Sequence, residues 1–99
     1  LETFIWDTAK NKYNKAKHKG LGFELASRIF NDPLLFQDYD YKHSDDECRE
    51  KYIGKLDGRY IVTVIATDRD GLIRLISARK ADKTEVRLYE ENAKRIQGY

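Results

Sequence analysis

The sequence predicts a small α+β domain: a short N-terminal strand and two helices, then a four-stranded antiparallel meander, then a C-terminal helix. Helix-capping residues precede amphipathic segments near both ends of the chain. Strand-like segments fill the middle, and turn signals separate them. The chain has 99 residues, of which 40% are hydrophobic and 36% are charged. These numbers predict one domain that covers residues 1–99.

The first elements are expected within residues 3–22. Residues 3–6 form a short apolar segment, typical of an edge strand, and Asp7 follows as the N-cap of a helix over residues 8–18. Gly20 and Gly22 then end this helix and turn the chain. The expected core contacts of the helix are Ala9, Tyr13 and Ala16, and the residues that share one face beside them are Lys10, Asn14 and Lys17.

A second, shorter helix is expected over residues 23–30, and Asn31-Asp32-Pro33 ends it. Its predicted buried stripe consists of Phe23, Ala26, Ile29 and Phe30. The four strands of the meander are expected over residues 34–41, 49–56, 60–67 and 72–78. The third of these strands is apolar on both faces, which places it near the centre of the sheet. Asp57-Gly58 and residues 68–71 supply the last two turns.

The last helix is expected over residues 83–96. Asp82 is its predicted N-cap, and Glu85 lies three residues later, where the partner in a capping box is found. The residues that this helix is expected to bury are Val86, Tyr89, Ala93 and Ile96.

Two arginines stand out beside that helix. Arg74 interrupts an apolar strand, and Arg79 lies where the strand gives way to the helix. A buried guanidinium group is costly unless an anion meets it. Because the two are five residues apart, an ideal strand would place them on opposite faces. We therefore expect Arg74 to pair with Glu47 or Glu50, and Arg79 to remain available for a phosphate.

The net charge is only +2, but it is distributed unevenly. Residues 10–19 contain five lysines, one histidine and no acid, whereas residues 38–50 contain six acids against Lys42 and Arg49. The basic helix is either an ordinary solvated surface or a binding site for an anionic partner. Charge alone leaves both interpretations open.

Several classes of protein and site are not expected. No apolar run approaches the length that crosses a bilayer, and the N-terminus lacks the pattern of a signal peptide. A single cysteine, Cys48, cannot form an internal disulfide. We therefore expect a cytoplasmic protein that makes no membrane contact. His43 is followed by three acids at positions 45–47, but without regular ligand spacing, so no metal site is expected.

An ordered set of residues extends from Phe4 to about Glu91. It consists of Phe4, Trp6, Asp7, Lys10, Asn14, Lys17, His18, Gly20, Phe23, Glu24, Ala26, Phe30, Asp32, Pro33, His43, Ser44, Glu47, Arg49, Ile53, Gly54, the R-x-I-S-A-R run of residues 74–79, Glu85 and Tyr89. With this set, the chain resembles the BrnT toxin family of bacterial type II toxin–antitoxin systems. Lys19 and Gly22, between the two helices, depart from the pattern, as does the charged pair Glu50-Lys51.

The resemblance implies a RelE-like fold and an endoribonuclease that cleaves RNA without a metal ion or other cofactor and arrests growth. It also implies neutralisation by a cognate, BrnA-like antitoxin. Operator DNA would then be bound only through the complex with that antitoxin.

Metal-free cleavage of RNA needs four things. One group takes the proton from the 2′-hydroxyl, cations stabilise the charge on the phosphate, another group protonates the leaving oxygen, and a basic, aromatic surface holds the strand. The catalytic candidates are His18, Lys17, Arg79 and Arg74, and the RNA-binding candidates are Lys10, Asn14, Lys15 and Tyr52. His43 is an alternative acid or base, although it lies in an acidic segment.

Structural explanations exist for some of these residues. A histidine near the C-terminus of a helix, such as His18, also interacts favourably with the helix dipole. Trp6 and Tyr89 fit apolar stripes, so we expect them in the core, whereas Tyr60 remains a possible stacking group. A second function stays open: a non-catalytic basic module that binds an acidic partner or nucleic acid, with its arginines in internal ion pairs or in the partner interface.

Overall fold

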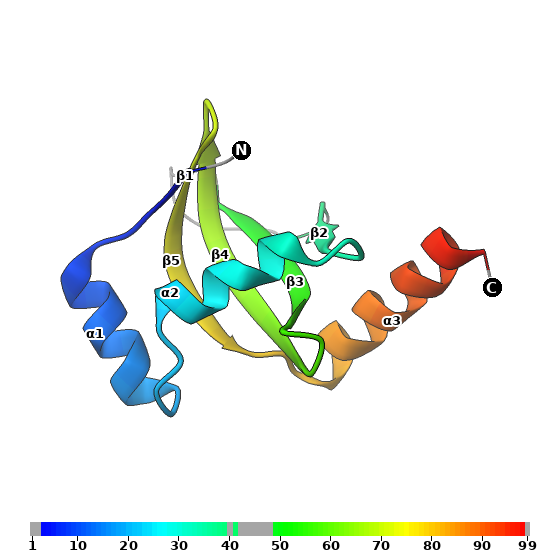
Figure 1. Ribbon diagram of the computed structural model, residues 1–99, viewed down its shortest axis with the longest axis horizontal. Helices are drawn as coiled ribbons and strands as arrows, with labels where there is room; N and C mark the ends of the chain where they lie inside the picture. The colour runs from blue at the N-terminus through cyan, green and yellow to red at the C-terminus, as the bar shows by residue number, and fades with distance from the viewer. Residues whose placement is uncertain (1–2, 40, 42–48, 99) are drawn as a thin grey trace.

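The computed structural model of the protein describes residues 3–39, 41 and 49–98. Within these residues it shows the expected α+β architecture, with one five-stranded sheet flanked by helices (Figure 1). The elements are β1 (Thr3–Ile5), α1 (Thr8–Lys17), α2 (Phe23–Ala26), the 3-10 helix η1 (Ser27–Asn31), β2 (Phe36–Asp38), β3 (Glu50–Leu56), β4 (Tyr60–Arg69), β5 (Leu72–Lys80) and α3 (Lys83–Gln97).

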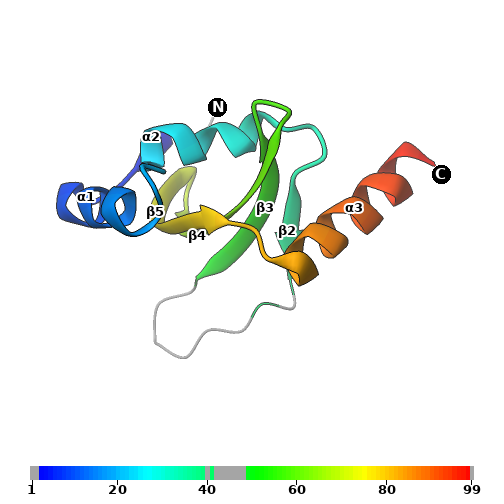
Figure 2. The same ribbon diagram turned by 90° about the horizontal axis from the view of Figure 1, so that it is seen from below.

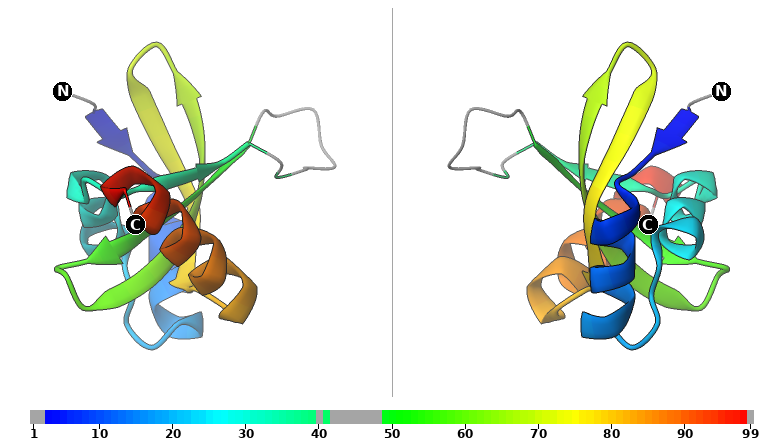
Figure 3. Two further views of the ribbon diagram at one scale, coloured as in Figure 1. Left: turned by 90° about the vertical axis from the view of Figure 1, so that its right-hand side faces the viewer. Right: turned by 90° about the vertical axis from the view of Figure 1, so that its left-hand side faces the viewer.

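The strand order in the sheet is β1-β5-β4-β3-β2. Strands β2 to β5 form the predicted antiparallel meander, and β4 lies at its centre as expected. Strand β1 pairs in parallel with the start of β5, a direction that the sequence did not indicate. The right-hand view of Figure 3 shows β1 beside one end of β5, with α1 continuing along the same side. Strand β2 is shorter than predicted, and β4 and β5 are longer.

Helices α2 and η1 cover one face of the sheet, called here the helical face, which carries Tyr52, Val64 and Ala78 (Figure 2). The expected helix over residues 23–30 is divided into α2 and η1, but its stripe packs as predicted: Phe23, Ala26 and Ile29 are buried, and Phe30 is partly buried. Gly54 allows η1 to approach β3 closely, because a Cβ atom there would lie 2.9 Å from the Ile29 Cβ.

Helix α3 packs against β2 and β3 with a second, smaller core cluster that includes Ile53 and Tyr89. The Tyr89 hydroxyl donates a hydrogen bond of 2.6 Å to Asp32, whose carboxylate also accepts from the backbone N–H of Lys55. Ile96 is 57% exposed, so its predicted burial was wrong. Figure 1 shows the reason, because the last turns of α3 extend beyond the sheet. None of the described helices is long and apolar enough to cross a membrane.

Helix α1 docks on a different face from the one predicted. Asp7 caps it as expected, accepting a hydrogen bond from the Lys10 N–H. However, the predicted core contacts Ala9, Tyr13 and Ala16 are exposed, and Tyr13 is 65% exposed. Asn11 and Asn14 are buried instead. The helix is therefore attached by amide hydrogen bonds and not by an apolar stripe.

The two asparagines bind backbone groups that would otherwise lack partners. The Asn11 side chain accepts a hydrogen bond from Phe23 N–H at the start of α2. The Asn14 side chain accepts from the N–H of Ala78 and donates to the carbonyl of the same residue, at 3.1 and 2.8 Å. It also donates to the carbonyl of Leu21. Asn14 thus acts as one residue of an additional strand, and closes the edge of β5 beyond the short β1.

Replacing Asn14 with Ala should reduce the free energy of unfolding by roughly 2–4 kcal/mol, because three buried backbone groups lose their partners. Urea denaturation measures this change, and the amide of Ala78 should exchange its hydrogen faster in the same variant. Asn31→Ala is the matched control, because Asn31 is exposed. A loss no greater than that of the control would show that Asn14 does not hold this edge.

Candidate functional site

Arg74 and Arg79 lie on the same face of the sheet. In the β4–β5 register, Arg74 is opposite Thr67 and Arg79 is opposite Thr63. The two threonines are four residues apart on β4, so their side chains share a face. The arginines are five residues apart, and a shift in register between the two pairs absorbs the additional residue. The prediction of opposite faces assumed an ideal strand and was wrong.

This face is called here the basic face, and is defined by Lys51, Thr63, Thr67, Arg74 and Arg79. The basic face is opposite the helical face. Lys51 of β3 lies on it because the partner of Lys51 in β4 is Ile65, two residues after Thr63. Because the register shift absorbs one residue, the Cα atoms of the two arginines are separated by the length of about four strand residues, or about 13 Å. Their guanidinium groups can therefore bind different groups of one extended ligand.

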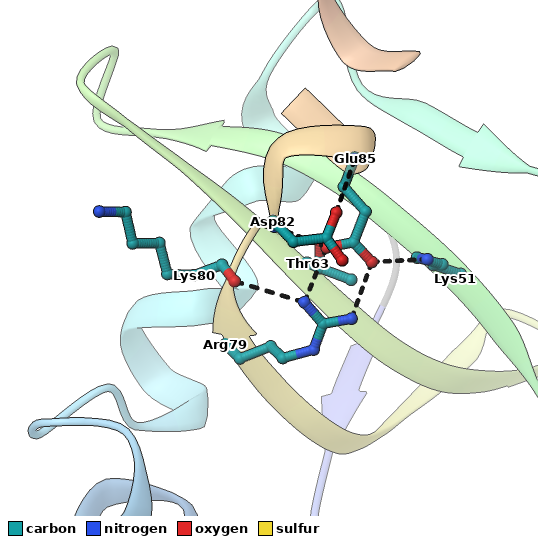
Figure 4. Close-up of polar contacts among 6 residues, drawn as sticks. All are labelled: Lys51, Thr63, Arg79, Lys80, Asp82 and Glu85. Atoms are coloured by element: carbon teal, nitrogen blue, oxygen red, sulfur yellow. Dashed lines mark hydrogen bonds and ion pairs between the residues drawn. The ribbon is translucent and has the colours of Figure 1, made fainter. Parts of the chain in front are cut away.

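Glu85, in the first turn of α3, is buried, and its carboxylate faces the Arg79 guanidinium (Figure 4). Its carboxylate accepts two hydrogen bonds from the Arg79 guanidinium, at 2.7 and 2.8 Å, and forms an ion pair with Lys51. It also accepts from the Thr63 hydroxyl and from the N–H of Asp82, which completes the predicted capping box. Glu85 is only 1% exposed. One carboxylate therefore links β3, β4, β5 and α3.

The ionisation of Glu85 follows from these partners. Burial alone would raise the pKa of its carboxyl, but the hydrogen bonds from Arg79, Lys51, Asp82 and Thr63 lower the pKa to about 2. The hydrogen bonds that Arg79 donates to Glu85 also raise the pKa of Arg79. The pair is therefore fully ionised at neutral pH, and Arg79 is held in one direction.

Arg79 has two N–H donors that no described residue occupies. A guanidinium group has five N–H donors. Glu85 takes one from each terminal nitrogen, and the carbonyl of Lys80 takes a second from Nη1 at 3.4 Å. The Nε–H and the remaining Nη2–H have no partner within the part of the chain that the structure describes. These two donors form a second fork, which matches two oxygens of a phosphate.

Arg74 is exposed and makes no hydrogen bond or ion pair with the described residues. Glu50, its expected partner, accepts hydrogen bonds from Gln37 and Tyr52 and shares the helical face with Tyr52. The other expected partner, Glu47, lies outside the described residues. Arg79, which was expected to remain available for a phosphate, therefore has an internal carboxylate, and no described residue provides one for Arg74.

His18 caps the C-terminus of α1 and is partly buried beside the end of β5. Partial burial, followed by the positive charges of Lys17 and Arg79, lowers the pKa of His18 from its ordinary value of 6.5. The imidazole is therefore mostly neutral at pH 7, and can accept a proton. Lys17 is exposed, with its ammonium 5.8 Å from the centre of the Tyr13 ring. The charges of Lys17 and Arg79 thus both act on His18, so three of the four catalytic candidates interact electrostatically.

Two of the four RNA-binding candidates serve the fold instead. Asn14 is buried against β5, and Tyr52 is 5% exposed in the core of the helical face. Lys10 and Lys15 are exposed on α1, and Lys15 lies 3.6 Å from the carboxylate of Glu24. The predicted core positions of Trp6 and Tyr89 are confirmed, since Trp6 packs on Phe23 and Tyr89 is buried. His43 and Cys48 lie outside the described residues.

Lys51 and Thr63 were not among the residues predicted for the site, and Glu85 was predicted only as a helix cap. A signal for Thr63 was available, because Thr63 and Thr67 are polar residues four apart within an otherwise apolar strand. Within residues 3–39, 41 and 49–98, no group of three or more His, Cys, Asp or Glu side chains is placed to hold a metal ion.

The sequence and the fold are similar to those of known proteins. A family model described as the ribonuclease toxin BrnT of type II toxin–antitoxin systems matches residues 6–85. The crystal structure of the Brucella abortus ribonuclease toxin BrnT has 28% sequence identity and a TM-score of 0.64, covering 84% of this chain and 100% of that chain. No curated protein matches. The match extends from Trp6, just before α1, to Glu85, and the chain belongs to the BrnT family of ribonuclease toxins of type II toxin–antitoxin systems.

Proposed function

We propose that the protein is an endoribonuclease toxin that cleaves RNA without a metal ion, with the scissile phosphate bound at Arg79. The observation that carries this proposal is the second fork of Arg79, to which none of the described residues is bonded while Glu85 fixes the guanidinium from the other side. A fixed guanidinium loses little side-chain entropy when it binds phosphate. It also needs no reorganisation as charge develops on the phosphate oxygens in the transition state.

His18 is the proposed general base. Its neutral imidazole takes the proton of the 2′-hydroxyl, and the 2′ oxygen attacks the adjacent phosphorus. The bond from phosphorus to the 5′ oxygen breaks, and this oxygen leaves with a proton from water. The products are a 2′,3′-cyclic phosphate and a 5′-hydroxyl. Lys17, next to His18, supplies a further positive charge to the phosphate.

Arg74 is proposed to bind a different phosphate of the same strand. It shares the basic face with Arg79 but lies about 13 Å away along β5. It is exposed, so its contribution is screened by solvent and is smaller than that of a fixed arginine. Lys10 and Lys15 on α1 extend the positive surface beyond His18.

The test is cleavage of single-stranded RNA in the presence of EDTA. Arg79→Ala should reduce kcat by roughly 100-fold or more, as expected when a preorganised oxyanion donor is lost. His18→Ala should cause a similar loss, and Arg74→Ala mainly a several-fold increase in KM. Arg87→Ala is the matched control, because Arg87 is exposed on α3. Metal-dependent cleavage, or full activity of the Arg79 and His18 variants, would contradict the proposal.

The Glu85→Gln variant removes the charged hydrogen bonds that orient Arg79 and leaves the positive charge of Arg79 in place. The ionised Glu85 has a lowered pKa, so it stabilises the fold above about pH 4.5, and this contribution is lost as the pH falls towards 2. The wild-type protein should lose on the order of 3 kcal/mol of unfolding free energy over this interval. The Gln variant should be less stable at pH 7, and should show a smaller loss on acidification.

Urea denaturation at pH 7 and pH 2 measures this difference, with Glu90→Gln, an exposed position on the same helix, as the control. At pH 7 the folded Glu85→Gln protein should also cleave RNA more slowly than wild type, because Arg79 is no longer held by two charged hydrogen bonds. Equal acid sensitivity of Glu85→Gln and wild type would show that Glu85 does not contribute as described.

The family implies an antitoxin partner, and we propose that this partner neutralises the toxin by covering the basic face. Carboxylates of a BrnA-like antitoxin would then occupy the positions of RNA phosphates at Arg74 and Arg79. Operator DNA would be bound only through that complex, and the free toxin would arrest growth.

The antitoxin proposal predicts that the purified complex does not cleave RNA, and that Arg74→Glu weakens antitoxin binding at least 10-fold through like-charge repulsion. Isothermal titration calorimetry measures the affinity, and Arg87→Glu is the control for the change in net charge. Equal activity of the free and bound toxin would refute occlusion of the site.

The ion pair between Arg79 and Glu85 also favours the second function, a binding module without chemistry, in which the arginines form internal salt bridges. The cleavage assay separates the two. RNA binding without turnover, together with normal growth when the protein is expressed, would favour the binding module.

A further inference from the structure

A cavity of about 420 Å³ opens between the loop that follows α1 and the ends of β3, β4 and β5. Its walls are aliphatic, formed by Leu25, Leu56 and Val62. Leu25 is partly exposed at the opening. The volume lies within the range of pockets that hold small ligands, about 300–1,000 Å³. The cavity can therefore accept a flat apolar group.

The polar residues around this cavity are cationic or aromatic. His18, Lys19 and Lys80 line it, and no acid does so among the described residues. Tyr60 completes the lining and is 59% exposed. The guanidinium of Arg59 lies over the Tyr60 ring, 5.8 Å from the ring centre. An apolar pocket with an exposed aromatic ring and surrounding cations matches a base attached to a phosphate backbone.

The cavity shares His18 with the proposed catalytic site, and Lys80, which lines it, is adjacent to Arg79 in the sequence. His18 lines it and also responds to the charge of Arg79. At the end of β5, Arg79 points to the basic face, and the next residue, Lys80, lines the cavity on the helical side. In Figure 4 the Lys80 side chain extends away from Glu85 and the Arg79 guanidinium. A strand whose phosphate is bound at Arg79 can therefore place a neighbouring base in the cavity.

We propose that this cavity binds a nucleobase of the single-stranded RNA substrate, next to the scissile phosphate. The proposal rests on the proposed ribonuclease function. Leu25, Leu56 and Val62 contact the base, Tyr60 stacks on it, and Lys19 and Lys80 bind the adjoining backbone. The cavity therefore determines which nucleotide is placed beside the cleaved bond.

A 2′-O-methyl RNA octamer tests this proposal, because its blocked 2′ oxygen prevents cleavage. Binding is measured by fluorescence anisotropy for a series in which one abasic position moves along the octamer. One abasic position should weaken wild-type binding more than the others. Tyr60→Ala should weaken binding of the intact octamer about 10-fold, in line with the loss of one stacked base. It should also remove the difference among abasic positions.

Two further variants are controls for the effect of Tyr60→Ala on RNA binding. Tyr60→Phe keeps the ring and should bind as wild type, whereas Tyr39→Ala removes an exposed tyrosine elsewhere and should have no effect. Equal binding of Tyr60→Ala and wild type would overturn the cavity proposal. So would unchanged RNA binding by Tyr60→Ala with a weakened antitoxin complex, which would make the cavity a protein interface. If the wild-type protein bound the octamer but did not cleave unmodified RNA, the proposed ribonuclease function would fail and base binding would stand.

Discussion

The buried carboxylate of Glu85 is the group on which this end of the molecule depends. It caps α3, pairs with Arg79 on β5 and Lys51 on β3, and accepts a hydrogen bond from Thr63 on β4. A buried carboxylate without these partners would carry a large desolvation cost. The contacts that orient Arg79 are therefore the same contacts that place α3 against the sheet. A substitution of Glu85 therefore changes both the stability of the fold and the direction of the Arg79 guanidinium group.

Beside Arg79, the outer edge of β5 depends on amide hydrogen bonds. Asn14 satisfies both backbone groups of Ala78, and so attaches α1 to the edge that β1 leaves open. This contact also fixes the position of His18, four residues later at the end of α1. The distance between His18 and Arg79 is thus set by rigid elements, β5 and a helix bound to β5, and not by a long loop.

The order of the helices and strands could be predicted because their signals are local: the N-caps Asp7 and Asp82, the turn at Asp57-Gly58, and the apolar segment of β4. The features that were predicted wrongly depend on contacts between distant residues. The shift in register between β4 and β5, which places both arginines on one face, leaves no local signal. Glu85 was recognised as a cap, but its ion pairs require β3 and β5 to be in place.

Arg79 can bind a phosphate although it is paired with Glu85. A phosphate at the second fork of Arg79 would be repelled by a carboxylate on the first, unless another cation shared that carboxylate. Lys51 does so, because its ammonium binds the oxygen that also accepts from Nη2 of Arg79. Arg79, Lys51 and Glu85 together carry a net charge of +1, and the carboxylate of Asp82, which also acts on Arg79, is engaged by the N–H of Glu85. The carboxylate therefore fixes the direction of the arginine, and Lys51 preserves the positive charge that attracts a phosphate.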